Sequence, residues 1–186
     1  MRIFLAVFPP EAVQGAVFAA AGALKKPGDG VSWVKRENLH YTLRFMGELG
    51  ADGARRVGEA ADVAAKAGAA FTAALGPLGA FPNARRARVL WAGMTEGAER
   101  LTALARALEA ALARNGFDQA DHPFSAHLTI GRVRDPRADW TERLEAVRVD
   151  PAAARFTVDR LCVMESRLSP KGSTYTVRHE ARLSGG

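Results

Sequence analysis

The stretch NLHYTLRFMGE, residues 38–48, sets a histidine two residues ahead of a threonine inside an apolar run, and FSAHLTIGRVR, residues 124–134, repeats that pattern. Apolar, β-branched and aromatic residues predict a strand over 39–46 and another over 126–133. Side chains two residues apart on a strand project from the same face, about 6 to 7 Å apart. Each strand should therefore present one histidine and one threonine to the same side of a sheet.

The residues that alternate with each pair predict how the two strands are anchored. The apolar alternates belong on the buried face: Tyr41, Leu43, Leu128 and Ile130. If Tyr41 is buried, its hydroxyl needs a hydrogen-bond partner or a route to solvent. The pairs that remain face a cleft: His40 with Thr42, and His127 with Thr129.

The rest of the chain predicts an α+β fold. Further strands are predicted at 2–8, 31–34, 70–75, 87–94, 154–165 and 173–182, and helices at 10–24, 52–68, 96–117 and 136–147. Because strands and helices do not alternate strictly, antiparallel or mixed sheets are favoured over a parallel one.

The spacing of the two motifs predicts an internal duplication. His40 and His127 stand 87 positions apart in a chain of 186 residues, and each motif closes a stretch with a strand, a helix and another strand. We expect a single domain, 1–186, made of two interleaved and pseudo-symmetric lobes. Each lobe would contribute one motif to a central cleft, with helices on the outside.

The composition indicates which partners and which cellular compartment to expect. The net charge of +6 favours anionic partners such as phosphates or nucleic acid, although compositional bias explains it equally well. The single cysteine, Cys162, excludes an internal disulfide framework and is expected to be a buried thiol. No apolar run reaches the ~18 to 20 residues of a membrane span. We expect a cytoplasmic monomer.

The paired motifs supply the parts of an acid–base site. Histidine titrates near neutral pH, and a threonine hydroxyl donates to an anionic oxygen. Two facing pairs give one acid, one base and two oxygen donors, which suits in-line displacement at phosphorus. No HExxH, CxxC or Asp-rich loop is present, so neither a metal nor a cofactor is expected.

Two arginines follow the motifs and are further candidate phosphate donors. Arg44 lies four residues after His40, and Arg132 five residues after His127. Strand parity puts Arg132 on the face opposite His127, so its use requires a bulge or bend, which Gly131 favours.

With these residues in hand, the sequence resembles the two-histidine (2H) phosphoesterase superfamily, specifically the RNA 2′,3′-cyclic phosphodiesterases, also called 2′-5′ RNA ligases or LigT-like proteins. The resemblance covers the whole chain and rests on RIFLAVFPPEAV, WVKRENLHYTLRFMGE, FSAHLTIGRV, VLWAG and VMESRLSPKGSTYTV. It implies a bilobal α+β fold and metal-independent hydrolysis of a 2′,3′-cyclic phosphate at an RNA end to a 2′-phosphomonoester. Reversible 2′-5′ ligation would be a side activity.

The resemblance also implies roles for individual residues. His40 would be the general acid that protonates the leaving 3′ oxygen, and His127 the general base that activates water. Phe45 occupies the position whose ring stacks on the nucleobase, which requires a bend near Gly47 because parity places it opposite His40. The residues that would hold the phosphate are Thr42, Thr129 and Arg132. Two departures from the family pattern, Arg36 and Tyr41, do not touch the chemistry.

For most of the remaining candidate residues, a structural or solvent-exposed position is expected rather than a role in the site. His122 is expected in a loop and His179 on an exposed strand, while Trp33 and Trp91 are expected in the core. The loop with Ser166, Ser169, Lys171 and Ser173 is a candidate cover for the cleft. A basic cluster, which either guides RNA or is a solvated loop, contains Arg85, Arg86 and Arg88.

Two other functions stay open at this point. The first is an RNA-binding module without catalysis, which fits the positive charge. The second is the same machinery acting on another cyclic phosphate, or on a 2′-5′ linked oligonucleotide, since the histidines do not identify the nucleoside.

Overall fold

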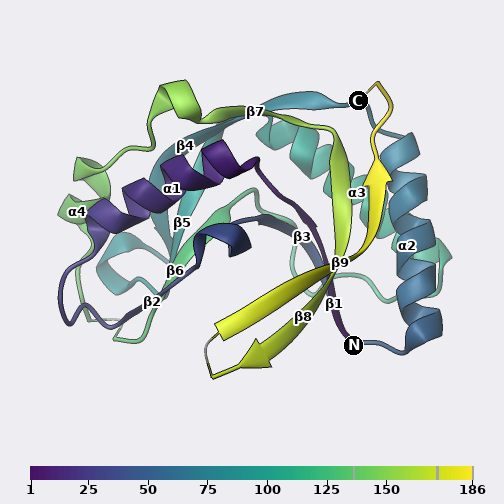
Figure 1. Cartoon of the computed structure of the whole chain (residues 1–186), viewed down its shortest axis with the longest axis horizontal. Helices are drawn as coiled ribbons and strands as arrows, with labels where there is room; N and C mark the ends of the chain where they lie inside the picture. Colours follow the sequence, from purple (N-terminus) through teal and green to yellow (C-terminus); the bar gives the residue numbers. More distant parts are fainter. Residues whose placement is uncertain (136, 171, 186) are drawn as a thin grey trace.

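The computed structural model describes residues 1–135, 137–170 and 172–185, and its nine strands form one sheet (Figure 1). The strands are β1 (Arg2–Val7), β2 (Val31–Trp33), β3 (Tyr41–Glu48), β4 (Phe71–Phe81), β5 (Val89–Glu96), β6 (Leu128–Val133), β7 (Arg155–Val158), β8 (Arg160–Ser169) and β9 (Gly172–Arg182). Their order is β7-β4-β5-β6-β3-β1-β8-β9, and β2 pairs with β6.

The two motif strands meet at the centre of the sheet. β3 leads outward to β1, β8 and β9, and β6 leads outward to β5, β4 and β7, so the chain leaves one half after β3 and returns to it at β8. All pairs between named strands are antiparallel. The expected α+β fold is thus confirmed, with antiparallel rather than mixed pairing.

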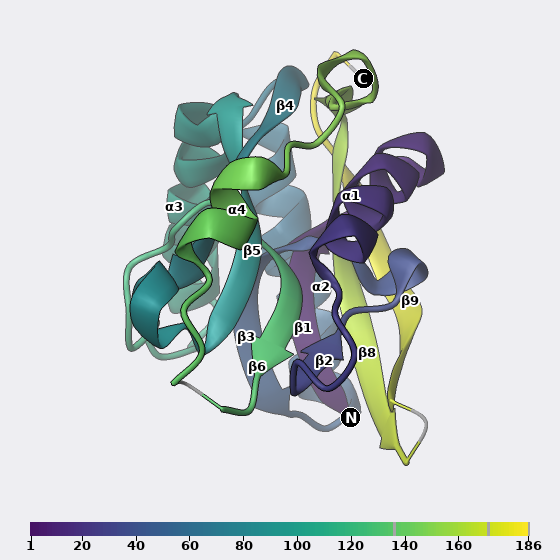
Figure 2. The same ribbon diagram turned by 90° about the vertical axis from the view of Figure 1, so that its left-hand side faces the viewer.

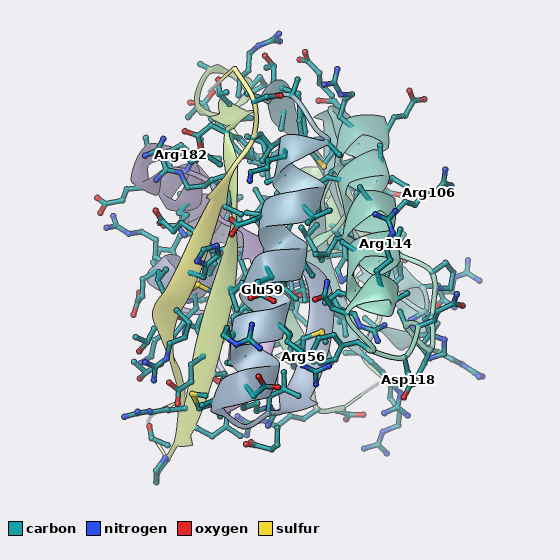
Figure 3. All side chains as sticks on the ribbon, turned by 90° about the vertical axis from the view of Figure 1, so that its right-hand side faces the viewer. Arg56, Glu59, Arg106, Arg114, Asp118 and Arg182 are labelled. Atoms are coloured by element: carbon teal, nitrogen blue, oxygen red, sulfur yellow. The ribbon has the colours of Figure 1, made fainter. Side chains whose placement is uncertain are left out.

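Within the described residues, four α-helices cover the sheet: α1 (Glu11–Leu24), α2 (Ala51–Lys66), α3 (Ala98–Arg114) and α4 (Thr141–Ala146). α2 and α3 lie side by side, with charged side chains such as Arg56 and Arg114 on their outer surface (Figure 3). Figure 2 shows α1 and α3 on opposite sides of the strands. The apolar stripe of α3 is buried as its periodicity predicts, and Gly116, at φ +77°, ends the helix.

Element bounds differ from the sequence predictions at several places. The predicted strand 154–165 is divided at Asp159 into β7 and β8, and the strand predicted at 70–75 continues to Phe81. The helix predicted at 136–147 spans only α4, and residue 136 lies outside the described residues. Both motif strands begin one residue after their histidine.

A small apolar cluster lies on the face of β1 and β8 that is turned toward the motifs. Phe4, Ala6, Cys162 and Met164 form it. Cys162 is buried as expected, and burial raises the pKa of its thiol to about 11. In the described part of the chain, no helix is both long and apolar enough to cross a membrane.

Candidate active site

The pairing of β3 with β6 brings the two motifs together. Tyr41 lies opposite Leu128, and both side chains are fully buried. One residue to either side of that pair, the antiparallel register sets His40 across from Thr129 and Thr42 across from His127. These four polar side chains therefore share the face opposite Tyr41 and Leu128.

Both imidazoles are held by the backbone in the same way. His40 Nδ1 lies 2.7 Å from the carbonyl oxygen of Asn38, and His127 Nδ1 lies 2.8 Å from that of Ser125. A carbonyl oxygen only accepts, so each Nδ1 carries the hydrogen and donates it. Nδ1 is thus the nitrogen of each ring that bonds the backbone, and His40 Nε2 lies 2.9 Å from the Thr42 hydroxyl.

Strand alternation alone would place Phe45 on the face opposite His40, but a β-bulge in β3 brings it to the same face. In the ladder with β1, Leu5 pairs with Arg44 and Ala6 pairs with Thr42, which leaves Leu43 as an extra residue. The bulge returns Phe45 to the face of Thr42, where its ring is 54% exposed. The same ladder has a second irregularity at Met46, beside Gly47, where the bend was expected, but the bulge that turns Phe45 to the face of Thr42 is the one at Leu43.

The second motif carries a bulge at the matching position. In the ladder with β5, Leu90 pairs with Gly131 and Trp91 pairs with Thr129, so Ile130 is the extra residue. This bulge turns Arg132 toward the side of Thr129, and both residues line one cavity. Its location is one residue before the predicted Gly131.

A cavity of about 260 Å³ lies over the two motifs. Its lining includes the expected site residues His40, Thr42, Phe45, Thr129 and Arg132. His127 is outside that lining and stands at its edge, across from Thr42. The structure thus gathers five of the six expected residues around one hollow and sets the sixth beside it.

His40 is enclosed by aromatic rings. Its ring centroid lies 5.1 Å from those of Phe4 and Phe8 and 5.5 Å from that of Tyr175. Burial lowers the pKa of His40 to about 4; the bond to the Asn38 carbonyl opposes this shift, and the charge of His127 adds to it. In the free protein at pH 7 this imidazole is neutral.

His127 is half-buried and has a different neighbour. Its ring meets the edge of Phe81 at 5.1 Å, and Phe81 is 36% exposed. Phe81 in turn contacts Trp91, whose indole covers Gly79. Trp91 was expected in the core but supports the wall beside His127, whereas Trp33 packs against the core as expected and also lines the cavity.

Several candidates lie elsewhere. Arg44 donates to the Asp118 carbonyl at 2.7 Å and pairs with Glu109, so it points away from the site. His122 is in a loop as expected. His179 is on a strand but half-buried, 2.8 Å from Asp62, so the expectation of an exposed residue is wrong.

The basic cluster is exposed, but the segment predicted to be a loop that covers the cleft is for the most part not a loop. Arg85, Arg86 and Arg88 are exposed near Phe81, between β4 and β5. The expected loop is mostly strand: Ser166 and Ser169 belong to β8, and Ser173 belongs to β9 and lines the cavity. Lys171 lies outside the described residues.

Sequence reasoning missed the wall formed by Asn38, Phe4 and Tyr175. Asn38 is buried, and its amide donates to the Ser173 carbonyl at 2.8 Å, which joins the segment before His40 to β9. The alternation in STYTV, residues 173–177, was the signal that could have identified Ser173 and Tyr175 as one face.

Two polar features complete the description of the site. Within the described residues, the buried Tyr41 hydroxyl has no hydrogen-bond partner, and burial raises the pKa of Tyr41. Among residues 1–135, 137–170 and 172–185, no three histidine, cysteine, aspartate or glutamate side chains converge as metal ligands.

Two histidines with two threonines and an arginine in one cleft are the parts of a phosphoester-cleaving acid–base site. The chain belongs to the 2′-5′ RNA ligase superfamily, whose model matches residues 9–169. A Thermotoga maritima protein named RNA 2′,3′-cyclic phosphodiesterase is 31% identical over 186 residues, covering 100% of this chain and 97% of its own. A Thermus thermophilus protein of the same name is 33% identical, with 100% and 91% covered.

Solved structures agree with the fold. A crystal structure of a Thermus thermophilus protein superposes with a TM-score of 0.81 at 31% identity, covering 100% of this chain and 99% of its own. Escherichia coli LigT complexed with 3′-AMP gives a TM-score of 0.76 at 24% identity, with 98% of each chain covered, and shares the fold.

Proposed function

We propose that the protein is an RNA 2′,3′-cyclic phosphodiesterase that works without a metal, by acid–base catalysis between His40 and His127. The observation that carries the proposal is the Tyr41–Leu128 register, which sets the two motifs face to face. The family membership and the relatives named RNA 2′,3′-cyclic phosphodiesterase support the substrate class.

The reaction is an in-line displacement. A water oxygen attacks phosphorus opposite the bond to the 3′ oxygen, and His127 takes the proton of that water. The bond between phosphorus and the 3′ oxygen breaks, and His40 gives a proton to the leaving oxygen. The products are a 2′-phosphomonoester and a 3′ hydroxyl, and the histidines regain their starting protonation states through solvent. A 5′-hydroxyl RNA end in place of water would give 2′-5′ ligation.

The surroundings of the two histidines support this division of roles. His127 is only partly buried and contacts Phe81 beside the cavity, whereas His40 lies among rings on the side of Phe45. The hydroxyls of Thr42 and Thr129, with the guanidinium of Arg132, are placed to meet charge on the non-bridging oxygens.

The low pKa of His40 sets a condition on the mechanism. A general acid must carry its proton, but burial keeps His40 neutral in the free protein at pH 7. An anionic phosphate bound beside the imidazole favours its charged form. The substrate would therefore help to protonate the acid that cleaves it.

The test is incubation with 2′,3′-cyclic AMP in the presence of chelator, followed by separation of 2′-AMP from 3′-AMP. We expect 2′-AMP alone, because the 3′ oxygen is the leaving group. A 3′-AMP product would contradict the direction of cleavage. A wild-type protein that does not hydrolyse this substrate, and whose RNA affinity is unchanged by the His40→Ala and His127→Ala substitutions, would favour a non-catalytic module.

We also infer that the protein works as a monomer in the cytoplasm. The chain has a single cysteine and so cannot form an internal disulfide, which fits a reducing compartment. Light scattering coupled to gel filtration tests the monomer, and a mass of two chains would contradict it.

A further inference from the structure

The histidine that would act as general acid stands just outside the paired part of its strand. β3 begins at Tyr41, and the pair of Tyr41 with Val7 is the last in its ladder with β1, so His40 and the residues before it lie outside the strand pairing. The polar backbone groups of such a segment need other partners. The position of the His40 imidazole therefore depends on the contacts made by the turn Arg36–Asn38 and by Leu39.

Two buried amide side chains hold this segment in place. Gln14, on α1, donates from Nε2 to the Leu39 carbonyl at 2.9 Å, and Asn38 donates from Nδ2 to the Ser173 carbonyl at 2.8 Å. Gln14 is 7% exposed and Asn38 is 9% exposed. A buried amide is costly unless it is hydrogen-bonded, so both side chains favour the one arrangement in which their bonds are made. One bond ties the segment to α1, and the other ties it to β9.

These bonds act on the two peptide units nearest to the imidazole. The Leu39 carbonyl, which Gln14 holds, belongs to the peptide bond that carries the nitrogen of His40. The Asn38 carbonyl, one peptide unit earlier, accepts the Nδ1 hydrogen of His40 at 2.7 Å. Asn38 thus contributes twice, with its carbonyl to the imidazole and with its amide to β9. The acceptor of the Nδ1 hydrogen is therefore anchored on both of its sides.

The second motif has the same backbone bond without this anchoring. His127 Nδ1 lies 2.8 Å from the Ser125 carbonyl, but Ser125 is exposed. Among the residues that the structure describes, the Ser125 side chain makes no hydrogen bond, and no side chain donates to the Ala126 carbonyl. The difference suits the two proposed roles. A general acid must aim at one leaving oxygen that is fixed in the bound substrate, whereas a base takes its proton from a water that can adjust.

The tautomer of His40 links this anchoring to the proposed reaction. Since Nδ1 is bonded to the backbone, Nε2 is the nitrogen that would give a proton to the leaving 3′ oxygen. Once the bond between Nε2 and its hydrogen breaks, the ring is neutral and keeps its hydrogen on Nδ1. That is the form to which the Asn38 carbonyl bonds, so the anchored acceptor favours the ring as the proton transfer leaves it.

We propose that Gln14 and Asn38 are positioning residues for the general acid, because together they fix the carbonyl that keeps the hydrogen of His40 on Nδ1 and leaves Nε2 for the leaving oxygen. Both act through His40. The inference rests on the proposed function for the role of His40, but the tautomer of the ring can be measured without any activity.

Two substitutions remove the amide donors without changing the charge. Asn38→Leu and Gln14→Met replace each side chain with one of similar size. Each should lower kcat on 2′,3′-cyclic AMP by about 10- to 100-fold and leave KM within about threefold of wild type, because the substrate still binds but meets a misplaced ring. Arg36→Gln is the control, since Arg36 is exposed in the same turn, and it should keep the kcat of wild type.

NMR of the imidazoles separates positioning from a merely structural role. At pH 7 the His40 ring is neutral, so long-range 1H–15N spectra report which nitrogen carries its hydrogen. We expect Nδ1 to carry it in wild type and in Arg36→Gln, and a mixture of the two tautomers in Asn38→Leu and Gln14→Met. The spectrum of His127 should not change in any of these variants, because its acceptor is the Ser125 carbonyl.

Three outcomes would overturn the inference. The first is a wild-type kcat in both variants, and the second is a lower kcat with an unchanged His40 tautomer. The third is an equal disturbance of His127, which would indicate a general loss of structure. Circular dichroism checks the fold, and the smaller changes Asn38→Ser and Gln14→Ala replace a variant that does not fold. A wild-type protein that leaves 2′,3′-cyclic AMP intact would instead sink the proposed function, while the NMR comparison would still test the anchoring.

Discussion

The two His-x-Thr motifs are built alike but lie in different surroundings. In both, the strand begins one residue after the histidine, Nδ1 bonds the carbonyl two residues earlier, and an extra residue follows three positions after the histidine. That residue is Leu43 in the first motif and Ile130 in the second.

The difference begins at the fifth position after each histidine. The bulge exposes Phe45 in the first motif and Arg132 in the second, so one side of the cleft offers a ring and the other a cation. His40 is packed among three rings, whereas His127 meets one ring at the edge of the cavity. In the proposed mechanism, the two similar backbone arrangements supply the reactive pair, and the side chains around them would give the cleft a nucleoside side and a water side.

The largest expected effect comes from removing either histidine. His40→Ala and His127→Ala should each lower kcat on 2′,3′-cyclic AMP by about 10²- to 10⁴-fold, because each removes one proton transfer. Steady-state kinetics in chelator measure the loss. His122→Ala is the control, since that residue is in an exposed loop, and full activity in either motif variant would contradict the account.

The fifth-position residues should fail in different ways. Arg132→Gln should lower kcat/KM about 10- to 100-fold on any cyclic phosphate, because it removes a charged donor. Phe45→Ala should lower kcat/KM by about tenfold or more on 2′,3′-cyclic AMP, and only slightly on ribose 2′,3′-cyclic phosphate, which has no base to stack. Equal losses by Phe45→Ala on the two substrates would show that the ring of Phe45 does not stack on the base.

The wall behind His127 depends on a glycine. A Cβ at Gly79 would overlap the indole of Trp91, so Gly79→Ala should reduce the free energy of unfolding by about 1–3 kcal/mol. Gly22→Ala, in α1, meets no atom within 4 Å and should instead stabilise by roughly 0.5–1 kcal/mol. Urea unfolding compares the two, and a neutral Gly79→Ala would show that Trp91 is free to move.

The smallest expected effect is a shift in the titration of His40. NMR of the imidazole should give a midpoint near 4 in the free protein, raised by about one unit in inorganic phosphate because the anion favours the charged ring. Between about 4 and the ordinary value of 6.5 the unfolded chain binds more protons, so the contribution of His40 to stability falls as the pH drops through this range. A midpoint that phosphate leaves unchanged would contradict substrate-assisted protonation.

The sequence was sufficient for the parts of the fold that depend on local pattern. Alternation identified the two motif strands and the buried faces of Tyr41 and Leu128, and the pairing of like motifs predicted a shared cleft. The sequence also predicted that Arg132 and Phe45 can face the cleft only if their strands contain a bulge or a bend. The position of each bulge could not be predicted, because a bulge is set by the register of the partner strand.

Burial and long-range contacts account for the remaining differences. His179 bonds Asp62 across 117 positions, and Arg44 bonds Asp118 across 74, so no local pattern reports either contact. The enclosure of His40 likewise depends on rings from β1 and β9.

The central claim is that the two motifs act as one catalytic unit, and a double-mutant cycle tests it most directly. Single-turnover rates on 2′,3′-cyclic AMP would be compared for wild type, His40→Ala, His127→Ala and the double variant. The account predicts that the double variant loses little more than either single one, because one proton transfer is of little use without the other. Losses that multiply would show that the histidines act independently and would contradict it.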